Sequence, residues 1–187
     1  MIDKPRKIPR IKDIYTVMRS NEGIFQYLDG EKAIEAYWDS FIVDALIGNF
    51  DRHANNWGYL FNPTTKDAKI APVFDCGSCL YPQLTDEAIE NILNKQDEIQ
   101  LRIDKFPTAA LDIGNGIKAN YKEYIGSFEN KDCVKALQRI YPKINLEFIS
   151  DIIDSVDGIS DVRRHFYKLM LNERYRQIIQ QSYLLYS

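Results

Sequence analysis

The sequence predicts a mainly α-helical protein that carries one small β-hairpin. Two observations lead to this fold class: apolar residues recur at helical spacing over most of the chain, and two short apolar runs flank a polar turn between residues 57 and 74. At 187 residues, with 45% hydrophobic and 27% charged residues, the chain is long enough to bury the core of one domain. We therefore expect a single compact unit over residues 1–187.

The first predicted helix covers residues 30–49. Its apolar side consists of Ile34, Tyr37, Trp38, Phe41, Ile42, Ala45 and Leu46. Charged residues, including Glu31 and Glu35, lie on the opposite side, so the segment is amphipathic. Gly48 is expected to end this helix, because glycine readily adopts the left-handed conformation that follows a last helical turn.

Residues 57–61 and 69–74 are the predicted strands of the hairpin. The polar segment 62–67, which contains Pro63, separates these two apolar runs and predicts a rather long connecting turn. The hairpin would carry the chain away from the end of the first helix and then back to it.

Helical spacing continues in the second half of the chain. Further helices are predicted over residues 85–95 (with Thr85 or Asp86 as the N-cap), 108–128, 131–140, 145–156 and 160–186. The 108–128 helix is expected to be broken or bent at Gly114-Asn115-Gly116. Residues 96–106 contain the short alternating run Ile99-Gln100-Leu101-Arg102-Ile103, and their assignment stays open.

The segment with the most functional information is Gly48-Asn49-Phe50-Asp51-Arg52-His53-Ala54-Asn55-Asn56, followed by Phe74-Asp75-Cys76-Gly77. An Asp with an Asn five residues later, and then an Asp-x-Gly, is the polar pattern of a kinase phosphoryl-transfer site. Asp51 could accept the proton of an attacking hydroxyl group. Asn56 and Asp75 offer hard oxygen ligands that suit Mg²⁺ bound to nucleotide phosphates. The predicted hairpin would bring Asp75 back beside Asn56.

The run Asp-Ala-Leu-Ile-Gly-Asn-Phe-Asp-Arg-His-Ala-Asn-Asn, with Ala-Pro-Val-Phe-Asp-Cys-Gly-Ser, resembles the C-terminal kinase region of HipA-like serine/threonine kinases, which are bacterial toxin-type kinases. Asp51, His53 and Asn56 match the Asp-x-His-x-x-Asn catalytic loop of that family. Phe74, Asp75 and Ser78 match its metal loop, with Phe in place of Tyr. The specific part of the resemblance covers residues 30–80.

This resemblance implies a helical kinase-like C-lobe with a small β-hairpin that carries the catalytic and metal-binding loops. It implies ATP and Mg²⁺ as cofactors, a protein Ser/Thr hydroxyl group as the acceptor, Asp51 as the catalytic base, and Asn56 and Asp75 as metal ligands. The residues that it places at the nucleotide are His53, Ala54, Asn55, Asn56, Phe74, Asp75, Cys76 and Gly77. HipA-like kinases often work with a DNA-binding antitoxin, so such a protein is an expected partner.

The N-terminal lobe of a kinase is not apparent in the sequence. Residues 1–29 contain no glycine-rich phosphate loop and no strand with the Lys that contacts the nucleotide phosphates. We therefore expect residues 1–187 to form a single C-terminal kinase domain without the N-lobe. A truncated gene product and half of a split kinase, whose N-lobe is a separate partner, both fit this pattern. Such a domain alone would bind Mg-nucleotide weakly.

Other interpretations of the motif remain open. Phosphoinositide-type lipid kinases share the Asp-Arg-His-x-x-Asn run and the Asp-x-Gly, although the Ile-Gly-Asn lead-in and the Ala-Pro-x-Phe-Asp run favour HipA-like proteins. Gly-Asn-Phe-Asp-Arg-His faintly resembles the Gly-Asn-His-Asp of metallophosphoesterases, whose two-metal sites need several His and Asp ligands, whereas this chain has two His. A non-catalytic kinase-lobe module that binds a partner would show no phosphoryl transfer under any metal or nucleotide condition.

Individual residues also have simpler explanations. Asp and Asn favour turns, so Asp51 and Asn56 by themselves are weak evidence. His53 could be a structural imidazole. Cys76-x-x-Cys79 is compatible with zinc or redox chemistry. A tetrahedral zinc site needs four ligands, however, and the remaining soft candidates are Cys133, His53 and His165.

The net charge of −3 argues against non-specific nucleic-acid binding. Basic residues gather at residues 4–12 and 163–176, a pattern more typical of solvated faces than of a binding patch. No apolar run approaches the roughly 20 residues of a membrane span. No secretion signal opens the sequence. Three cysteines are consistent with a reducing compartment. We expect a cytoplasmic protein without direct nucleic-acid or membrane contact.

Overall fold

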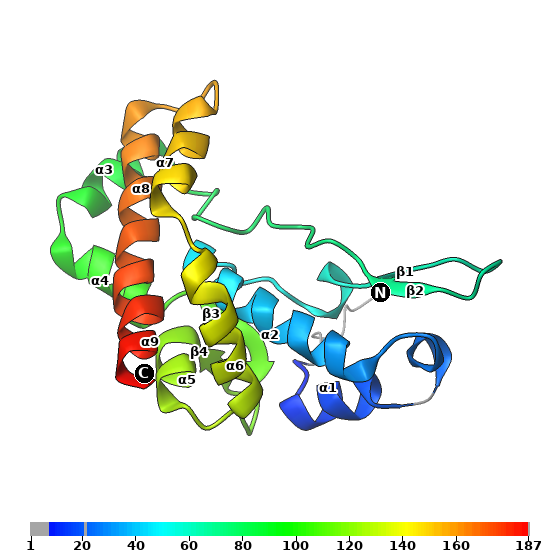
Figure 1. The fold of residues 1–187 in the computed structure, drawn as a ribbon. Helices are drawn as coiled ribbons and strands as arrows, with labels where there is room; N and C mark the ends of the chain where they lie inside the picture. The colour runs from blue at the N-terminus through cyan, green and yellow to red at the C-terminus, as the bar shows by residue number, and fades with distance from the viewer. Residues whose placement is uncertain (1–7, 21, 187) are drawn as a thin grey trace, which may run out of the picture.

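The computed structural model describes residues 8–20 and 22–186, and it is mainly α-helical, as predicted (Figure 1). The helices are α1 (Ile11–Met18), α2 (Gly30–Ile47), α3 (Asp86–Leu93), α4 (Gln96–Asp104), α5 (Tyr121–Ser127), α6 (Lys131–Ile140), α7 (Leu146–Ser155), α8 (Asp161–Arg174) and α9 (Gln181–Tyr186). Single turns of tighter helix lie at Gly23–Gln26, Ala54–Asn56 and Tyr141–Lys143, and a wider π-helical segment at Tyr175–Gln180 joins α8 to α9. The strands are β1 (Tyr59–Phe61), β2 (Ala68–Ile70), β3 (Thr108–Asp112) and β4 (Lys118–Asn120).

Helix α2 runs through the middle of the molecule, with α6 along one side and the α8–α9 helix across its C-terminal half (Figure 1). Its N-cap is Asp29, whose side chain accepts hydrogen bonds from the backbone N–H groups of Glu31 and Lys32. Ala33, Trp38, Ile42 and Ala45 are completely buried. The predicted apolar side of this segment therefore forms the central core.

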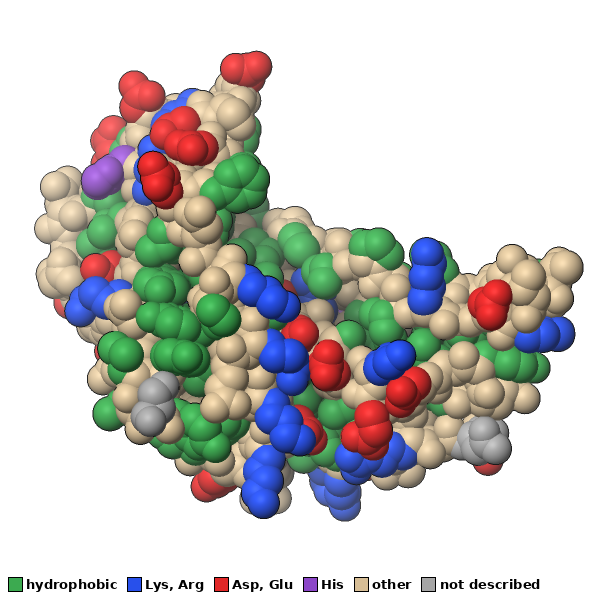
Figure 2. Space-filling view, in the orientation of Figure 1, with side chains coloured by type: hydrophobic (Ala, Val, Ile, Leu, Met, Phe, Trp, Pro, Cys, Tyr) green, Lys and Arg blue, Asp and Glu red, His purple; other side chains and the backbone are tan. Residues whose placement is uncertain are grey.

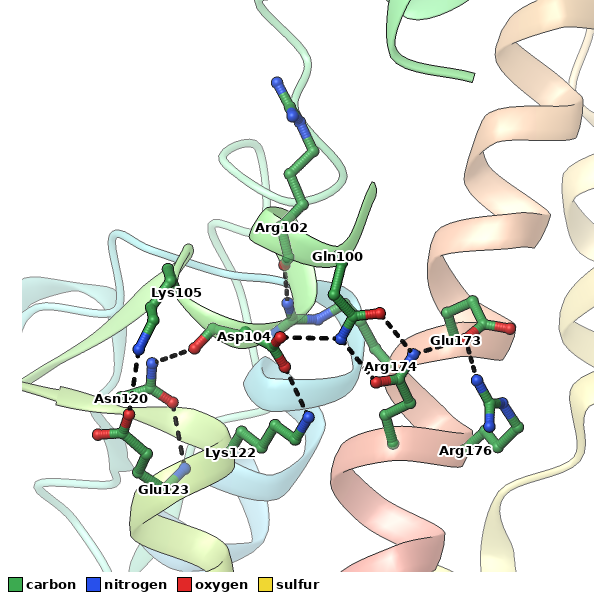
Figure 3. Close-up of polar contacts among 11 residues, drawn as sticks. Gln100, Arg102, Asp104, Lys105, Asn120, Lys122, Glu123, Glu173, Arg174 and Arg176 are labelled. Atoms are coloured by element: carbon green, nitrogen blue, oxygen red, sulfur yellow. Dashed lines mark hydrogen bonds and ion pairs between the residues drawn. The ribbon is translucent and has the colours of Figure 1, made fainter. Parts of the chain in front are cut away.

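The end of α2 is fixed in two ways. Gly48 has a φ of 67°, and its N–H group donates to the Asp44 carbonyl, so it ends the helix as predicted. Arg174 of α8, which is 1% exposed, donates from Nε to the Ala45 carbonyl at 2.7 Å and from Nη1 to the Arg102 carbonyl at 2.7 Å (Figure 3). A buried cation at the carbonyl end of a helix is electrostatically favourable. The chain thus leaves α2 from a rigid point.

Side-chain contacts around α4 hold the same region together (Figure 3). Asp104 accepts from Lys122 of α5 at 2.6 Å and from Gln100 at 2.9 Å. Gln100 also donates to Gln177 at 2.8 Å, in the π-helical segment. These bonds connect α4 to α5 and to the π-helical segment.

The predicted hairpin is confirmed, although its strands are shorter than expected. β1 and β2 pair antiparallel, with Tyr59 opposite Ile70 and Phe61 opposite Ala68. In the connecting turn, Asn62 Oδ1 accepts from the N–H groups of the two threonines that follow Pro63. The hairpin projects from the body of the protein (Figure 1), and the chain then returns along α2.

The helix predicted over residues 108–128 is wrong in its first part. Residues 108–112 and 118–120 form the antiparallel strands β3 and β4, and only Tyr121–Ser127 is helical. Gly114, Asn115 and Gly116 all have positive φ, and Asp112 Oδ1 accepts from the N–H groups of both glycines. Glycine and asparagine at such positions favour a tight hairpin turn rather than a bend in a helix.

The helices predicted over residues 85–95, 131–140 and 145–156 are confirmed with small changes in their ends, whereas the helix predicted over 160–186 is interrupted by the π-helical segment Tyr175–Gln180. Residues 96–106, which the sequence left open, contain α4, where Glu98 and Arg102 form an i,i+4 ion pair at 2.6 Å. Thr85 is the N-cap of α3, because its Oγ1 accepts from the Ala88 N–H group. In the described segments, no helix combines the length and apolar character that a bilayer crossing requires.

The basic residues near the C-terminus form no separate patch. The ion pairs there are Arg163 with Asp86, Lys168 with Asp154, and Arg176 with Glu173. Arg164 donates to backbone carbonyls, whereas Arg174 is buried and so is not solvated as predicted. Most of the predicted basic segment at residues 4–12 lies outside the described residues.

The Tyr15 hydroxyl joins three helices and provides a test of this packing. It accepts from Trp38 Nε1 at 2.8 Å and donates to Asp132 Oδ2 at 2.7 Å. Burial, followed by the hydrogen bond to Asp132, raises the pKa of Tyr15 to about 12. The folded state therefore favours the neutral phenol, and this contribution to stability is complete below the unfolded pKa of about 10 and is lost as the pH rises through about 12.

We expect the free energy of unfolding to fall more steeply above pH 10 in the parent than in Tyr15→Phe. Urea unfolding at pH 8, 10 and 11.5 measures this difference. Parallel pH profiles for the two proteins would show that Tyr15 is not held in the contacts described above.

Candidate active site

The loop that follows α2 holds the backbone of Asp51 at both of its polar groups. The Asp51 N–H group donates to Asn49 Oδ1 at 3.1 Å. The Asp51 carbonyl accepts from the His53 N–H group at 2.9 Å and from Asn56 Nδ2 at 2.7 Å. Asn49 is itself completely buried, and its carbonyl accepts from the Tyr121 hydroxyl at 2.7 Å. The position of Asp51 is thus set by main-chain contacts that do not use its carboxylate.

The Asp51 carboxylate lies at the surface, with its side chain 53% exposed, and Oδ1 is 4.0 Å from His53 Nε2. His53 Nδ1 accepts from the Asn55 N–H group at 3.2 Å, so a neutral His53 carries its proton on Nε2, toward Asp51. An exposed carboxylate on a fixed backbone can accept a proton from an incoming hydroxyl group. Ala54, Asn55 and Asn56 form the short helical turn that follows.

Asn56 is buried, with 3% exposure, and its amide orientation follows from its contact. Because Nδ2 donates to the Asp51 carbonyl, Oδ1 is the atom of this side chain that can serve as a metal ligand. The structure therefore brings together Asp51 and Asn56, two of the predicted site residues.

Phe74, Asp75, Cys76 and Gly77 form an exposed loop after the hairpin. Asp75 has a φ of 56°, a left-handed conformation that Asp tolerates better than most residues, and the Cys79 N–H group donates to the Cys76 carbonyl at 3.1 Å. This side of the molecule is hollowed between the α7–α8 arm and the projecting hairpin, and hydrophobic side chains lie along its floor (Figure 2).

Arg52 connects the two loops, a role that the sequence motif by itself does not indicate. Its Nη1 donates to the Asn56 carbonyl at 2.7 Å and to the Phe74 carbonyl at 2.6 Å. Its Nη2 also contacts Cys76 Sγ at 3.4 Å. The loop that contains Asp75 is thus held against the loop that contains Asn56. In the sequence, Arg52 is visible only as a basic residue next to Asp51. That position does not show which groups its side chain contacts.

Asp44, on the last turns of α2, is the carboxylate that faces Arg52. It accepts from Arg52 Nε at 2.9 Å and Nη2 at 3.0 Å, and from Asn49 Nδ2 at 2.9 Å. Burial raises the pKa of Asp44, and the hydrogen bonds and charge of Arg52 oppose that effect. Conversely, burial lowers the pKa of Arg52, but Asp44 outweighs it and raises that pKa overall. In the sequence, Asp44 carries no signal beyond its place in the predicted helix.

A cavity of about 410 Å³ lies beside this cluster, on the α2 side. Its walls come from α2, the catalytic loop, the end of the hairpin and β3, and its polar lining includes Asp44, Arg52 and Asn56. Of the proposed base and metal ligands, Asn56 lines this cavity and Asp51 and Asp75 do not, so the cavity adjoins the predicted reaction centre at Asn56.

The donor atoms fit magnesium better than zinc. Asn56 Oδ1 and the Asp75 carboxylate are hard oxygen donors, and Mg²⁺ is typically held by one or two such side chains together with phosphates and water. Among the residues that the structure describes, no group of three or more His, Cys, Asp or Glu side chains could hold a metal ion. All three cysteines are free, and Cys133 is buried in α6. The zinc alternative therefore finds no site in the described part of the chain.

Comparison with known proteins gives one clear relationship. No protein-family model matches the chain. The serine/threonine-protein kinase CtkA of Helicobacter pylori is 46% identical over 143 residues, which cover 76% of this chain and 44% of that protein. A crystal structure of the Helicobacter pylori proinflammatory kinase CtkA aligns with a TM-score of 0.90 at 38% identity, covering 98% of this chain and 66% of that one.

The predicted fold class is thus confirmed, since the chain has the mainly helical fold of the corresponding part of that kinase. The chain spans less than half of the length of the CtkA sequence that it matches. At this level of identity and structural agreement, the chain is a homologue of the serine/threonine-protein kinase CtkA.

Proposed function

We propose that this chain is the C-terminal lobe of a HipA-like serine/threonine kinase, which transfers the γ-phosphoryl group of ATP to a protein hydroxyl group. The observation that carries the proposal is the loop after α2, where Asp51 and Asn56 are hydrogen-bonded at 2.7 Å and Arg52 holds the Asp75 loop against them. The similarity to a protein named as a serine/threonine kinase supports the same reaction class.

Each residue has a role in this proposal. Asp51 accepts the proton of the attacking hydroxyl group, and its fixed backbone keeps the carboxylate in one place. Asn56 Oδ1 and Asp75 would hold Mg²⁺, which when bound neutralises charge on the nucleotide phosphates. His53, Ala54 and Asn55 would lie near the nucleotide, as would the segment 74–77. Phosphoryl transfer depends mainly on positioning and charge neutralisation, which such an arrangement can provide.

The partners follow from the same proposal. A protein with an accessible Ser or Thr is the substrate, and a separate N-lobe would cover the phosphates from the other side. A DNA-binding antitoxin-type protein is a further proposed partner, and the proposed compartment is the cytoplasm. The exposed Tyr59, Leu60, Val73 and Phe74 provide apolar surface on the hairpin and the loop beside it, where a second lobe could pack.

Calorimetric titration of ATP with Mg²⁺ tests the metal-nucleotide site. We expect measurable binding by the parent and none by Asp75→Ala, because this substitution removes the carboxylate ligand. Asp67→Ala is the matched control, since Asp67 is an exposed Asp in the turn of the same hairpin, and it should bind like the parent. Absence of binding by a folded parent would contradict a working metal-nucleotide site in this lobe alone, and would favour a non-catalytic module or a lobe that needs its N-lobe in trans.

A further inference from the structure

Arg52 occupies the point at which the two loops of the site meet. One nitrogen atom, Nη1, donates to the carbonyl of Asn56 at 2.7 Å and to the carbonyl of Phe74 at 2.6 Å. The first carbonyl belongs to one proposed metal ligand, and the second belongs to the residue immediately before the other, Asp75. A single guanidinium group thus contacts the backbone beside both proposed ligands.

The orientation of that guanidinium is fixed from the opposite side. Arg52 Nε and Nη2 make a two-pronged contact with the Asp44 carboxylate, at 2.9 and 3.0 Å. The side chains of Arg52 and Asp44 are only 8% and 2% exposed, so water screens this pair little. Asn49 Nδ2 also donates to Asp44, which ties the carboxylate to the start of the catalytic loop. The anchor is the C-terminal part of α2, where Ile42, Ala45 and Leu46 are buried in the core.

Only arginine has the donors that this arrangement requires. A guanidinium presents several N–H groups in a rigid plane, whereas a lysine ammonium is a compact charge without fixed donor directions. Lysine could still neutralise Asp44, but it could not also reach both carbonyls in a fixed plane. A lysine at position 52 would therefore keep an electrostatic role toward Asp44 but lose the geometric role of holding the two carbonyls.

We propose that Arg52 is a positioning residue that sets the spacing between the Mg²⁺ ligands Asn56 and Asp75, an inference that rests on the proposed kinase function. It acts through the carbonyls of Asn56 and Phe74 and does not itself touch metal or substrate. Groups that orient metal ligands in this way typically contribute a factor of about 10–100 to metal affinity.

Binding of Mn²⁺ in the presence of ATP, followed by the electron paramagnetic resonance signal of free Mn²⁺, tests this inference on the complete chain. We expect Arg52→Lys to raise the Mn²⁺ dissociation constant by about 10- to 100-fold. Arg139→Lys is the matched control, because Arg139 makes a similar two-nitrogen contact with Asp39 on another face of α2, and it should bind Mn²⁺ like the parent.

Amide hydrogen exchange distinguishes positioning from general stabilisation. We expect exchange of the Cys79 and Leu80 amides, which donate to the carbonyls of Cys76 and Ile47, to accelerate in Arg52→Lys while the amides of α2 keep their parent rates, because only the loop loses its anchor. Equal acceleration in α2 and in the loop would overturn the inference, since it would mean that Arg52 merely stabilises the whole domain.

The binding experiment separates failure of this inference from failure of the proposed function. Parent-like Mn²⁺ affinity in Arg52→Lys, together with loss of binding in Asp75→Ala, overturns the role of Arg52 and leaves the kinase assignment intact. Absence of binding by the parent, or parent-like binding by Asp75→Ala, overturns the metal-nucleotide site proposed for this chain and this inference with it.

If Arg52→Lys does not fold, a second variant tests the same inference. The double variant Asp44→Asn/Arg52→Gln removes both buried charges and so leaves no unpaired ion in the core. It also removes the fork that reaches the two carbonyls, and we expect the same loss of Mn²⁺ affinity. Parent-like affinity in this double variant would overturn the inference.

Discussion

Asp51→Asn is expected to lower the rate of phosphoryl transfer by about 10²- to 10⁴-fold, which is the usual contribution of a general base. The amide of Asn has the same shape as the carboxylate but cannot accept a proton at neutral pH. The contacts that fix this residue use its backbone N–H group and carbonyl, so the substitution should leave the loop unchanged. Transfer of labelled phosphate from ATP to casein, as a generic Ser/Thr substrate, measures the effect.

The comparison of rate with binding makes this prediction specific. Calorimetry should show nucleotide affinity in Asp51→Asn within about twofold of the parent, because a residue that acts only on the hydroxyl proton contributes little to ground-state binding. Asp67→Asn, at an exposed Asp on the hairpin turn, should transfer phosphate at the parent rate. Parent-like turnover in Asp51→Asn would show that another group removes the proton.

Trp38→Ala is expected to lower the free energy of unfolding by about 3–5 kcal/mol, the usual cost of removing a large aromatic side chain from a core. Trp38 is completely buried, stacks on Tyr124 with ring centres 5.7 Å apart, and packs edge-on against Phe41 at 5.1 Å. Its Nε1 donates to the Tyr15 hydroxyl, so the substitution also removes the contact that joins α1 to α2. Denaturation in guanidinium chloride measures the change.

The control for this prediction is Val17→Ala on α1, whose side chain is 57% exposed. It should change the free energy of unfolding by about 0.5 kcal/mol or less, as exposed substitutions usually do. A cost below about 1 kcal/mol for Trp38→Ala would mean that the central core is looser than the contacts indicate. Because α2 ends at the catalytic loop, such looseness would also weaken the argument that the loop is rigidly positioned.

The local signals in the sequence were sufficient to predict helix α2 and the hairpin formed by β1 and β2. The 3.6-residue spacing from Ile34 to Leu46 identified the buried face, and Gly48 marked the end of the helix because its position needs a positive φ. The spacing of Asp51, Asn56 and Asp75 was likewise visible, since short-range motifs keep their meaning when the surrounding fold is unknown. The position of the loop after α2 followed from these same signals.

Residues 108–128 show where local patterns were insufficient. Apolar residues from Ala109 to Ile125 are compatible with helical spacing, but the burial of Ala109 and Leu111 alternates along a strand that pairs with residues 118–120. Short strands of this kind are stabilised mainly by their partner and by the surrounding core. The glycines at 114 and 116 signalled a break, and only the pairing showed that the break was a hairpin turn.

The sequence by itself determined which residues carry the proposed chemistry: a carboxylate, an amide and a second carboxylate at a spacing that suits a metal-nucleotide site. The tertiary structure decided how they are held. Arg52 draws its partners from Asp44, Asn56 and Phe74, which belong to a helix, a loop and the segment after the hairpin. Hydrogen bonds between such distant positions exist only after the core of α2 has formed, so no periodicity or motif in the linear sequence could predict them.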